Sequence, residues 1–318
     1  MNKTKFGVFL PFYAFKSETK DSSSLFSQIR DVALECERLG YDSVWLDDHL
    51  MFENRSILEC WTTLSALATA TSKIRLGTMM LCNGFRNPAV LAKMAATLDV
   101  ISNGRLEFGI GAGVQEDEHL AYGIPFLKPH ARVSRLGEAV EIIKKIWTEE
   151  KASYEGKYYR TSEAMCEPKP VQNPHPPITI GGSGEKFTLK VAAQHADRFD
   201  WGPLPLEVYK HKLEVLEGYC KSVGRDFRKI EKSCWLGGQM FLVPSQEEVD
   251  EKVRLLKPRN VSMEDFKKIS FVATPDDCRQ EIRRYASLGV TYFMLFFGDL
   301  PDLSSVRLFS EVIKTLKQ

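Results

Sequence analysis

FGVFLPF (6–12), SLFSQIRDVALECERLG (24–40) and SVWL (43–46) follow one another along the chain, and their order decides the fold class. The first and third runs are almost continuously apolar, which is typical of strands buried on both faces of a parallel sheet. In the middle run, apolar residues recur every three or four positions, which predicts an amphipathic helix, and Gly40 favours its end there. The stretch is therefore a strand–helix unit followed by the next strand.

The same unit repeats through the rest of the chain. Further strand-like runs lie at 74–81, 105–111, 177–182, 197–201, 232–243 and 290–297. Because about eight buried strands alternate with amphipathic helices, we predict an α/β fold, a single (β/α)8 TIM barrel over residues 1–318. An open doubly wound sheet is the alternative, but it would more often show a break in composition between its halves.

Three stretches depart from the repeat. KASYEGKYYRT (151–161) predicts a small hairpin, and PKPVQNPHPP (168–177) predicts a stiff extended connector. Residues 244–274 are charged and match no unit. We therefore expect an irregular insertion at 244–274, near the last units of the barrel.

Charge and cysteine content narrow the possible functions. Forty-three basic and 42 acidic residues leave a formal charge of +1, without a basic block interleaved with aromatics, so nucleic acid is not an expected partner. The seven cysteines form no C-x-x-C pair, which argues against a disulfide framework and structural zinc. The histidines show no H-E-x-x-H spacing, so no metal site is expected. A reducing cytoplasm fits this cysteine usage best.

No segment is expected to enter a membrane. The N-terminal run MNKTKFGVFLPFYAFK contains Gly7 and Pro11 and lacks a small-residue cleavage site, so we interpret it as a first strand and not a signal peptide. No apolar segment approaches the roughly 20 residues that a spanning helix needs. These features predict a soluble, cytoplasmic protein.

Charged residues end the second predicted strand. YDSVWLDDHLM (41–51) places Asp47, Asp48 and His49 directly after a buried run. In a barrel, the C-terminal ends of the strands form the catalytic face. A histidine there can exchange a proton near neutral pH, and an adjacent carboxylate can fix its tautomer or bind a ring N–H of a cofactor. The alternative is a solvated strand end with a histidine satisfied in the turn.

Two glycine runs follow later strands. FGIGAG (108–113), with Gly111 and Gly113, allows close approach of a flat or phosphorylated ligand, although the polar loop 114–119 replaces the helix of a dinucleotide fingerprint. ITIGGSG (178–184) leads into a predicted helix at 185–196, where exposed N–H groups favour an anion. This second run is a candidate phosphate cradle, but it is no Walker A motif. The alternatives are tight strand-to-loop packing for the first run and a plain glycine turn before a capped helix for the second.

Several stretches, taken in order, resemble the bacterial luciferase-like superfamily, and within it the oxidoreductases that use the deazaflavin coenzyme F420. The resemblance runs through GYDSVWLDDH (40–49), KIRLGTMMLCNGFRNPAVLAKMAATLDVISNGRLEFGIGAG (73–113), AYGIPF (121–126), YEGKYYR (154–160), EPKPVQNPHPPITIGGSG (167–184) and ADRFDWG (196–202). It covers most of residues 1–202. The C-terminal third agrees mainly in the order of strands and helices.

The resemblance implies a luciferase-like (β/α)8 barrel that moves hydride between C5 of coenzyme F420 and a small organic substrate. It implies a ring contact at Asp48 and a proton donor or acceptor at His49. It also implies a non-prolyl cis peptide between Met79 and Met80 that backs the ring, together with Cys82. By the same resemblance, the phosphate lies at Gly181, Gly182, Ser183 and Gly184.

One position departs from the resemblance, and other functions stay open. Some deazaflavin dehydrogenases of this family have a catalytic glutamate directly after the G-x-G-x-G run, where this chain has Val114, so phosphorylated-sugar oxidation is not expected. Glu116, Asp117 and Glu118 follow closely and either face the pocket or form a solvated acidic turn. The alternatives are an FMN-dependent monooxygenase and a non-catalytic flavin-binding barrel or partner subunit. By analogy alone, we expect a homodimer.

Overall fold

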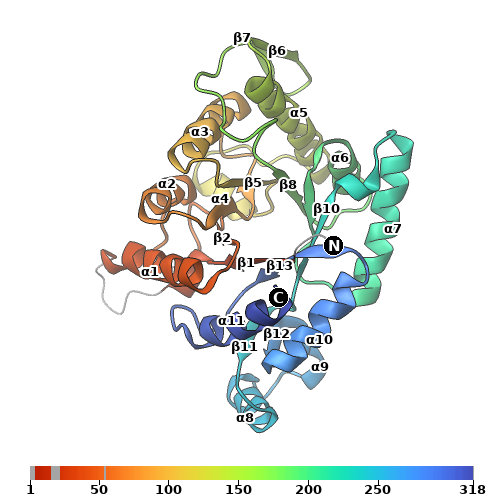
Figure 1. Cartoon of the computed structure of the whole chain (residues 1–318). Coiled ribbons are helices and arrows are strands. Elements are labelled where there is room, and N and C mark those ends of the chain that lie inside the picture. Colours follow the sequence, from red (N-terminus) through yellow and green to blue (C-terminus); the bar gives the residue numbers. More distant parts are fainter. Residues whose placement is uncertain (1–3, 16–21, 54, 318) are drawn as a thin grey trace.

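The computed structural model describes residues 4–15, 22–53 and 55–317, and it is a closed barrel of parallel strands ringed by helices (Figure 1). The ring follows the order β1-β2-β3-β5-β8-β9-β10-β13, and pairing of β13 with β1 and of β3 with β5 closes it. These strands are Lys5–Phe9, Ser43–Leu46, Arg75–Thr78, Leu106–Gly111, Ile178–Gly181, Arg198–Asp200, Glu231–Trp235 and Val290–Leu295. The predicted (β/α)8 barrel is thus confirmed.

One predicted strand, 74–81, is divided in the structure. It becomes β3 and the short β4 (Leu81–Cys82), which pairs with β5 beyond the end of β3. Between them lies the cis peptide bond joining Met79 and Met80, as expected from the resemblance. The division places residues 79 and 80 at the C-terminal rim of the barrel.

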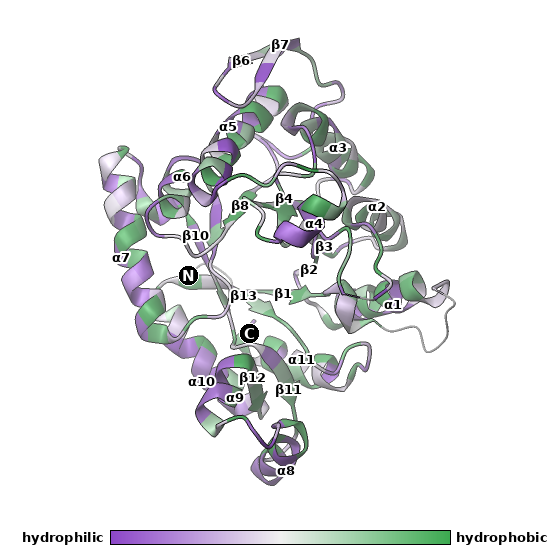
Figure 2. Cartoon of the chain, turned by 180° about the vertical axis from the view of Figure 1, so that it is seen from behind, coloured by the Kyte–Doolittle hydropathy of each residue, from purple (hydrophilic) through white to green (hydrophobic). Residues whose placement is uncertain are grey.

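Helices cover the outside of the ring because each has one apolar face. The eight that lie between successive barrel strands or after the last one are α1 (Ser24–Leu39), α2 (Cys60–Ala70), α3 (Pro88–Ile101), α5 (Pro129–Thr148), α6 (Thr188–His195), α7 (Leu206–Ser222), α10 (Pro275–Ala286) and α11 (Ser304–Leu316). In α1, Leu25, Ile29 and Val32 are buried at helical spacing, and the helix ends at Gly40 with φ of 84°. The short α4 (Glu116–Ala121) instead lies at the mouth of the barrel, as the reverse view in Figure 2 shows.

Two segments outside the regular strand–helix repeat form additional β-structure. The predicted hairpin is present as antiparallel β6 (Ala152–Glu155) and β7 (Arg160–Ala164). The predicted strand 232–243 is divided into β10 and β11 (Gln239–Leu242), and β11 leaves the ring to pair with β12 (Ser270–Ala273).

The expectation of an irregular segment at 244–274 is wrong, because this segment contains α8 (Gln246–Leu256), α9 (Met263–Ile269) and β12. The side chains of Ser245 and Ser262 cap the two helices, and each helix buries one apolar residue, Val249 or Phe266. The sequence pattern did not predict these short amphipathic helices, because they contain many charged residues and few apolar ones.

An ion network occupies the N-terminal end of the barrel, with the side chains of Arg198 and Glu107 buried at its centre. Arg198 lies 2.8 Å from Glu107 and 2.7 Å from Glu231, and Lys5 lies 2.9 Å from Glu231. All four residues stand at or next to the start of their strands. Because this end of a barrel serves stability and the opposite end carries the chemistry, we interpret the network as structural.

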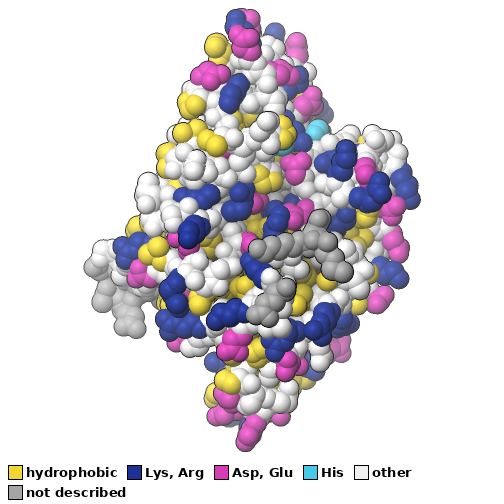
Figure 3. Space-filling view, viewed as in Figure 1, with side chains coloured by type: hydrophobic (Ala, Val, Ile, Leu, Met, Phe, Trp, Pro, Cys, Tyr) yellow, Lys and Arg dark blue, Asp and Glu magenta, His cyan; other side chains and the backbone are white. Residues whose placement is uncertain are grey.

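Two further observations concern the exterior. Basic and acidic side chains are interspersed over the face shown in Figure 3. Within residues 4–15, 22–53 and 55–317, no helix is both long and apolar enough to cross a membrane.

Candidate active site

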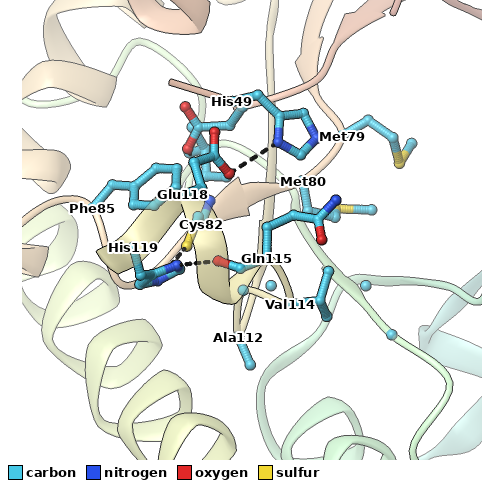
Figure 4. Close-up of a pocket in the computed structure, with 16 residues that line it drawn as sticks. His49, Met79, Met80, Cys82, Phe85, Ala112, Val114, Gln115, Glu118 and His119 are labelled. Carbon is cyan, nitrogen blue, oxygen red and sulfur yellow. Dashed lines mark hydrogen bonds and ion pairs between the residues drawn. The ribbon is translucent and has the colours of Figure 1, made fainter. Parts of the chain in front are cut away.

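A cavity of about 290 Å³ lies at the C-terminal ends of β2, β4, β5 and β8 (Figure 4). Nine of the residues expected at the site line it: Asp48, His49, Met79, Met80, Cys82, Gly111, Gly113, Gly181 and Gly182. It is completed by Leu81, Phe85, Ala112, Val114, Gln115, Glu118 and His119. Chain segments far apart in the sequence therefore meet at the mouth of one barrel, on its catalytic face.

His49 is paired with a buried carboxylate from α4. Its Nδ1 lies 3.1 Å from Oε2 of Glu118, whose side chain is only 3% exposed (Figure 4). The other oxygen of Glu118 accepts hydrogen bonds from the backbone N–H groups of Leu50 and Met51, the latter at 3.1 Å. Glu118 thus fixes the imidazole ring and also the turn that follows His49.

Glu118 is the functional candidate that sequence reasoning did not select. The acidic run predicts carboxylates near the pocket, but helical geometry separates them: Glu116 and Asp117 are exposed, whereas Glu118 turns inward. Val114, the residue directly after the first glycine run, is 79% exposed. The carboxylate beside the histidine therefore comes from four residues further along the chain.

Asp48 lies at the cavity wall, but its carboxylate is bound to the protein. Its oxygens accept hydrogen bonds from Arg86 at 2.7 and 2.9 Å and from the backbone N–H of Cys82 at 2.9 Å. Arg86 also donates to Glu59 at 2.5 Å. Through these bonds Asp48 holds β4 against the end of β2, and its contact with a cofactor ring stays a prediction.

Asp47 is not among the residues that line this cavity. Its Oδ1 accepts a hydrogen bond from the backbone N–H of Phe12 at 3.0 Å, and burial raises its pKa to about 6. Asp47 therefore anchors the segment after β1.

Cys82 and His119 form the wall opposite His49. Burial raises the pKa of the Cys82 thiol to about 12, so the thiol is neutral at physiological pH. Nδ1 of His119 lies 2.7 Å from the carbonyl oxygen of Gln115, to which it donates, and this leaves Nε2 to accept from the Cys82 sulfur at 3.6 Å. Neither residue is a free nucleophile here.

Glycines, which have no side chain, shape the rest of the cavity. A Cβ on Gly181 would lie 2.5 Å from Cγ of Met80, and a Cβ on Gly113 would lie 2.6 Å from the Cys82 sulfur. Gly113 also has φ of 77°, which side-chain-bearing residues rarely adopt. Only glycine lets the ends of β5 and β8 approach β4 this closely.

The second glycine run continues away from the cavity. Ser183 and Gly184 are not among the lining residues, and α6 begins at Thr188, three residues later than the predicted start at 185. The carbonyl oxygen of Ser183 accepts a hydrogen bond from the buried Lys212 at 2.8 Å. The sequence did not single out this lysine, which comes from α7.

Comparisons with known proteins agree with this architecture. A family model described as luciferase-like monooxygenase matches residues 4–259. An F420-dependent glucose-6-phosphate dehydrogenase of Segniliparus rotundus is 30% identical, over 84% of this chain and 87% of that protein. An uncharacterized protein of Mycobacterium tuberculosis is 34% identical over 53% of this chain, and the match spans only 58% of that protein.

The fold has a close counterpart among solved structures. An F420-dependent secondary alcohol dehydrogenase in complex with an F420-acetone adduct superposes with a TM-score of 0.82 and 23% identity, over 99% of this chain and 100% of that one. At this identity the likeness concerns the fold. Together with the family match over residues 4–259 and the relative from Segniliparus rotundus, it leads to one conclusion: the chain belongs to the luciferase-like monooxygenase family.

Proposed function

We propose that the protein is an oxidoreductase that transfers a hydride between coenzyme F420 and a small organic substrate, with His49 giving or taking the proton. The observation that carries the proposal is the pairing of His49 with the buried Glu118 at the mouth of the barrel. The names of curated relatives, F420-dependent dehydrogenases, support the cofactor and the reaction class.

The cavity suits a flat heterocycle. Met79 and Met80 form one wall, and glycines at the ends of β5 and β8 leave room for a planar group to approach the backbone. Ligand sites of this kind are concave, mostly apolar and supplied with a few polar groups. When bound, the deazaflavin would supply the hydride acceptor or donor at C5.

His49 is placed to move a proton at the substrate. With Nδ1 held by Glu118, its Nε2 is the nitrogen left for a substrate oxygen. The negative charge of Glu118 stabilises the imidazolium when His49 takes a proton, and it preserves the ring orientation when the proton leaves. Glu118 is therefore a positioning residue, and His49 is the proton-transferring one.

An FMN-dependent monooxygenase is the second candidate, because the family model is described as a luciferase-like monooxygenase. The same cavity walls would face the isoalloxazine ring of FMN. A non-catalytic barrel is disfavoured because curated relatives are named dehydrogenases. Phosphorylated-sugar oxidation is not part of the proposal, because this chain has Val114 where some deazaflavin dehydrogenases have a catalytic glutamate.

Titration of the purified protein with F420 and with FMN, followed by cofactor fluorescence, tests the choice of cofactor. We expect saturable binding of F420 and at least tenfold weaker binding of FMN. Tight binding of FMN without binding of F420 would overturn the proposal in favour of the monooxygenase.

The proton role of His49 needs a separate test. The protein is screened with F420 and reduced F420 against alcohols, aldehydes and unsaturated acceptors, and His49→Asn is then compared with the wild type. We expect an unchanged dissociation constant for F420 and a kcat lowered about 100-fold, within the range for loss of a general acid or base. An unchanged kcat would remove His49 from the mechanism. Light scattering tests the further expectation of a homodimer.

A further inference from the structure

The inside of the barrel contains an apolar cluster that the proton-transferring pair does not use. Along a barrel strand, side chains point alternately into the barrel and out toward the helices. The inward-pointing apolar side chains form a cluster separate from the core between strands and helices. Five of its members are Phe9, Trp45, Trp235, Met294 and Phe296.

This cluster becomes accessible at the C-terminal ends of the strands. Trp45 within β2 and Met294 within β13 are 0% and 1% exposed, whereas Phe296, two residues beyond Met294, is 8% exposed. Phe9 at the end of β1 and Trp235 at the end of β10 are 8% and 9% exposed. The upper side of the cluster therefore faces the mouth of the barrel at the ends of β1, β10 and β13.

A row of aromatic rings connects this part of the mouth to His49. Phe52 lies 5.9 Å from the imidazole of His49 and stacks on Tyr13 with 5.1 Å between the ring centroids. Separations of this size are typical of favourable aromatic pairs. The row continues from Tyr13 through Phe296, Phe9 and Trp235, with successive separations of 5.9, 5.7 and 5.2 Å. These five side chains, from Phe52 to Trp235, are called the aromatic row below.

The aromatic row adjoins the cavity proposed for the cofactor ring. Met79 belongs to the interior cluster and also lines that cavity, close to His49 (Figure 4). The cavity lies at the ends of β2, β4, β5 and β8, and the row lies at the ends of β1, β10 and β13, the neighbouring part of the ring of strands. A molecule that rests on the row would therefore contact both the cavity and His49.

This part of the mouth provides no counter-charge for an anionic substrate. No lysine, arginine or histidine occurs among the described residues that follow β1, β9, β10 and β13, at 10–13, 201–205, 236–240 and 296–299. The guanidinium of Arg55 lies 6.0 Å from the ring of Tyr13, but it donates to the Tyr13 carbonyl oxygen and lies 3.3 Å from the carboxylate of Glu53. Arg55 is therefore already paired.

The acidic groups near the row are also bound within the protein. Asp200 accepts hydrogen bonds from the hydroxyl of Ser233 at 2.6 Å and from the indole N–H of Trp235 at 2.8 Å. Burial and, to a smaller extent, the charge of Asp47 raise the pKa of Tyr13 to about 12, so its phenol is neutral. The row is therefore an uncharged surface, and Asp200 fixes the orientation of one of its rings.

We propose that the aromatic row binds the body of the substrate and selects a bulky apolar molecule, aromatic or alicyclic, whose polar group is confined to the reacting carbon. This inference rests on the proposed function, because it takes the cofactor cavity and His49 as the reacting centre. An oxygen on the reacting carbon would face Nε2 of His49, while the apolar body leaves water for the aromatic surface. A phosphate or carboxylate in the same place would lose its hydration without gaining a cation.

The test compares three secondary alcohols that differ in apolar body and charge: 1-phenylethanol, 2-propanol and glycerol 3-phosphate. Their dissociation constants are measured by saturation-transfer NMR, with and without saturating F420, so that the result does not depend on turnover. We expect 1-phenylethanol to bind the wild type about 30-fold more tightly than either of the others, as for the transfer of a phenyl group out of water. F420 should not weaken its binding.

Trp235→Leu removes one ring of the row, and Trp147→Leu is the matched control. Both indoles are buried and donate one hydrogen bond, to Asp200 at 2.8 Å and to the Ala92 carbonyl oxygen at 2.9 Å, but Trp147 belongs to α5, outside the barrel. We expect Trp235→Leu to weaken binding of 1-phenylethanol about 10-fold and to leave that of F420 within twofold. Trp147→Leu should change neither. Phe296→Leu, which breaks no hydrogen bond, replaces Trp235→Leu if that variant does not fold.

The outcomes separate this inference from the proposed function. If 1-phenylethanol binds in a manner that depends on Trp235 but F420 does not bind, the proposed function fails and the row remains a binding site for an apolar molecule. If F420 binds, two results overturn the inference alone: glycerol 3-phosphate binds as tightly as 1-phenylethanol, or Trp235→Leu and Trp147→Leu bind 1-phenylethanol equally. Displacement of 1-phenylethanol by F420 would place the cofactor on the row and would also overturn it.

Discussion

We expect the ion pair between Arg86 and Asp48, at the rim of the candidate active site, to contribute strongly to the free energy of unfolding. The side chain of Asp48 is fully buried and that of Arg86 is 13% exposed, and two of the three hydrogen bonds accepted by Asp48 come from Arg86. Replacing Arg86 by Met would leave a buried carboxylate with the Cys82 N–H as its remaining donor. Loss of one partner from a buried pair costs about 3–5 kcal/mol of unfolding free energy.

The assay is urea unfolding, monitored by tryptophan fluorescence. The single and double variants of Arg86 and Asp48 are compared in a double-mutant cycle. In the Arg86→Met background, Asp48→Asn removes the unpaired charge, so the double variant should recover about 2 kcal/mol relative to additive behaviour. The matched control is Arg30→Met. The guanidinium of Arg30 lies 2.8 Å from the carboxylate of Asp31, nearly the same distance as in the Arg86–Asp48 pair, but these side chains are 41% and 61% exposed. Exposed pairs of this kind contribute about 0.2–1 kcal/mol.

Two results would refute this reasoning. One is a loss on Arg86→Met no larger than that on Arg30→Met. The other is strict additivity of the Arg86 and Asp48 substitutions. Either would show that Asp48 does not depend on Arg86 and would return it to the role of a free cofactor contact.

Four further predictions follow from the geometry of the site. Glu118→Gln should lower kcat about 10- to 100-fold at an unchanged dissociation constant for F420, because it replaces a charge-assisted bond to His49 worth about 1.5–3 kcal/mol. Glu116→Gln, exposed on the same helix, is the control, and a kcat for Glu118→Gln no lower than that of the control would contradict the pairing. Burial raises the pKa of Asp47 to about 6, so its contribution to stability is complete below about pH 4 and is lost as the pH rises through 6. Asp47→Asn should therefore remove up to roughly 3 kcal/mol of pH-dependent destabilisation that develops in urea unfolding as the pH rises from about 3 to 7. An unaltered pH dependence would be inconsistent with a buried, titrating Asp47. Gly181→Ala would place a Cβ 2.5 Å from Met80 and should cost about 1–3 kcal/mol and weaken F420 binding, whereas Gly218→Ala, with open space around it, should not destabilise the fold. All seven cysteines are buried, so Ellman's reagent should label no thiol rapidly in the native protein and all seven in urea, and fast labelling of Cys82 would contradict its pKa of about 12.

The barrel itself was predictable from the sequence because its signals are local. A buried parallel strand needs a short apolar run, and the helix that covers it needs an apolar face at helical spacing, so each unit can be recognised within about 30 residues. The segment 244–274 escaped recognition because α8 and α9 bury few side chains and their charge outweighs their apolar positions.

The sequence by itself determined the strand–helix order, the location of His49 at a strand end and the glycines at the ends of β5 and β8. Only the tertiary structure decided that Glu118 and not its two acidic neighbours turns inward, that Asp48 is bound by Arg86, and that the start of α5 lies beside Gly113. These pairs are separated by 69, 38 and 19 residues, and nothing local selects one partner among many charged residues. Closure of the barrel brings the strand ends together, and burial then makes an unpaired charge there too costly to tolerate.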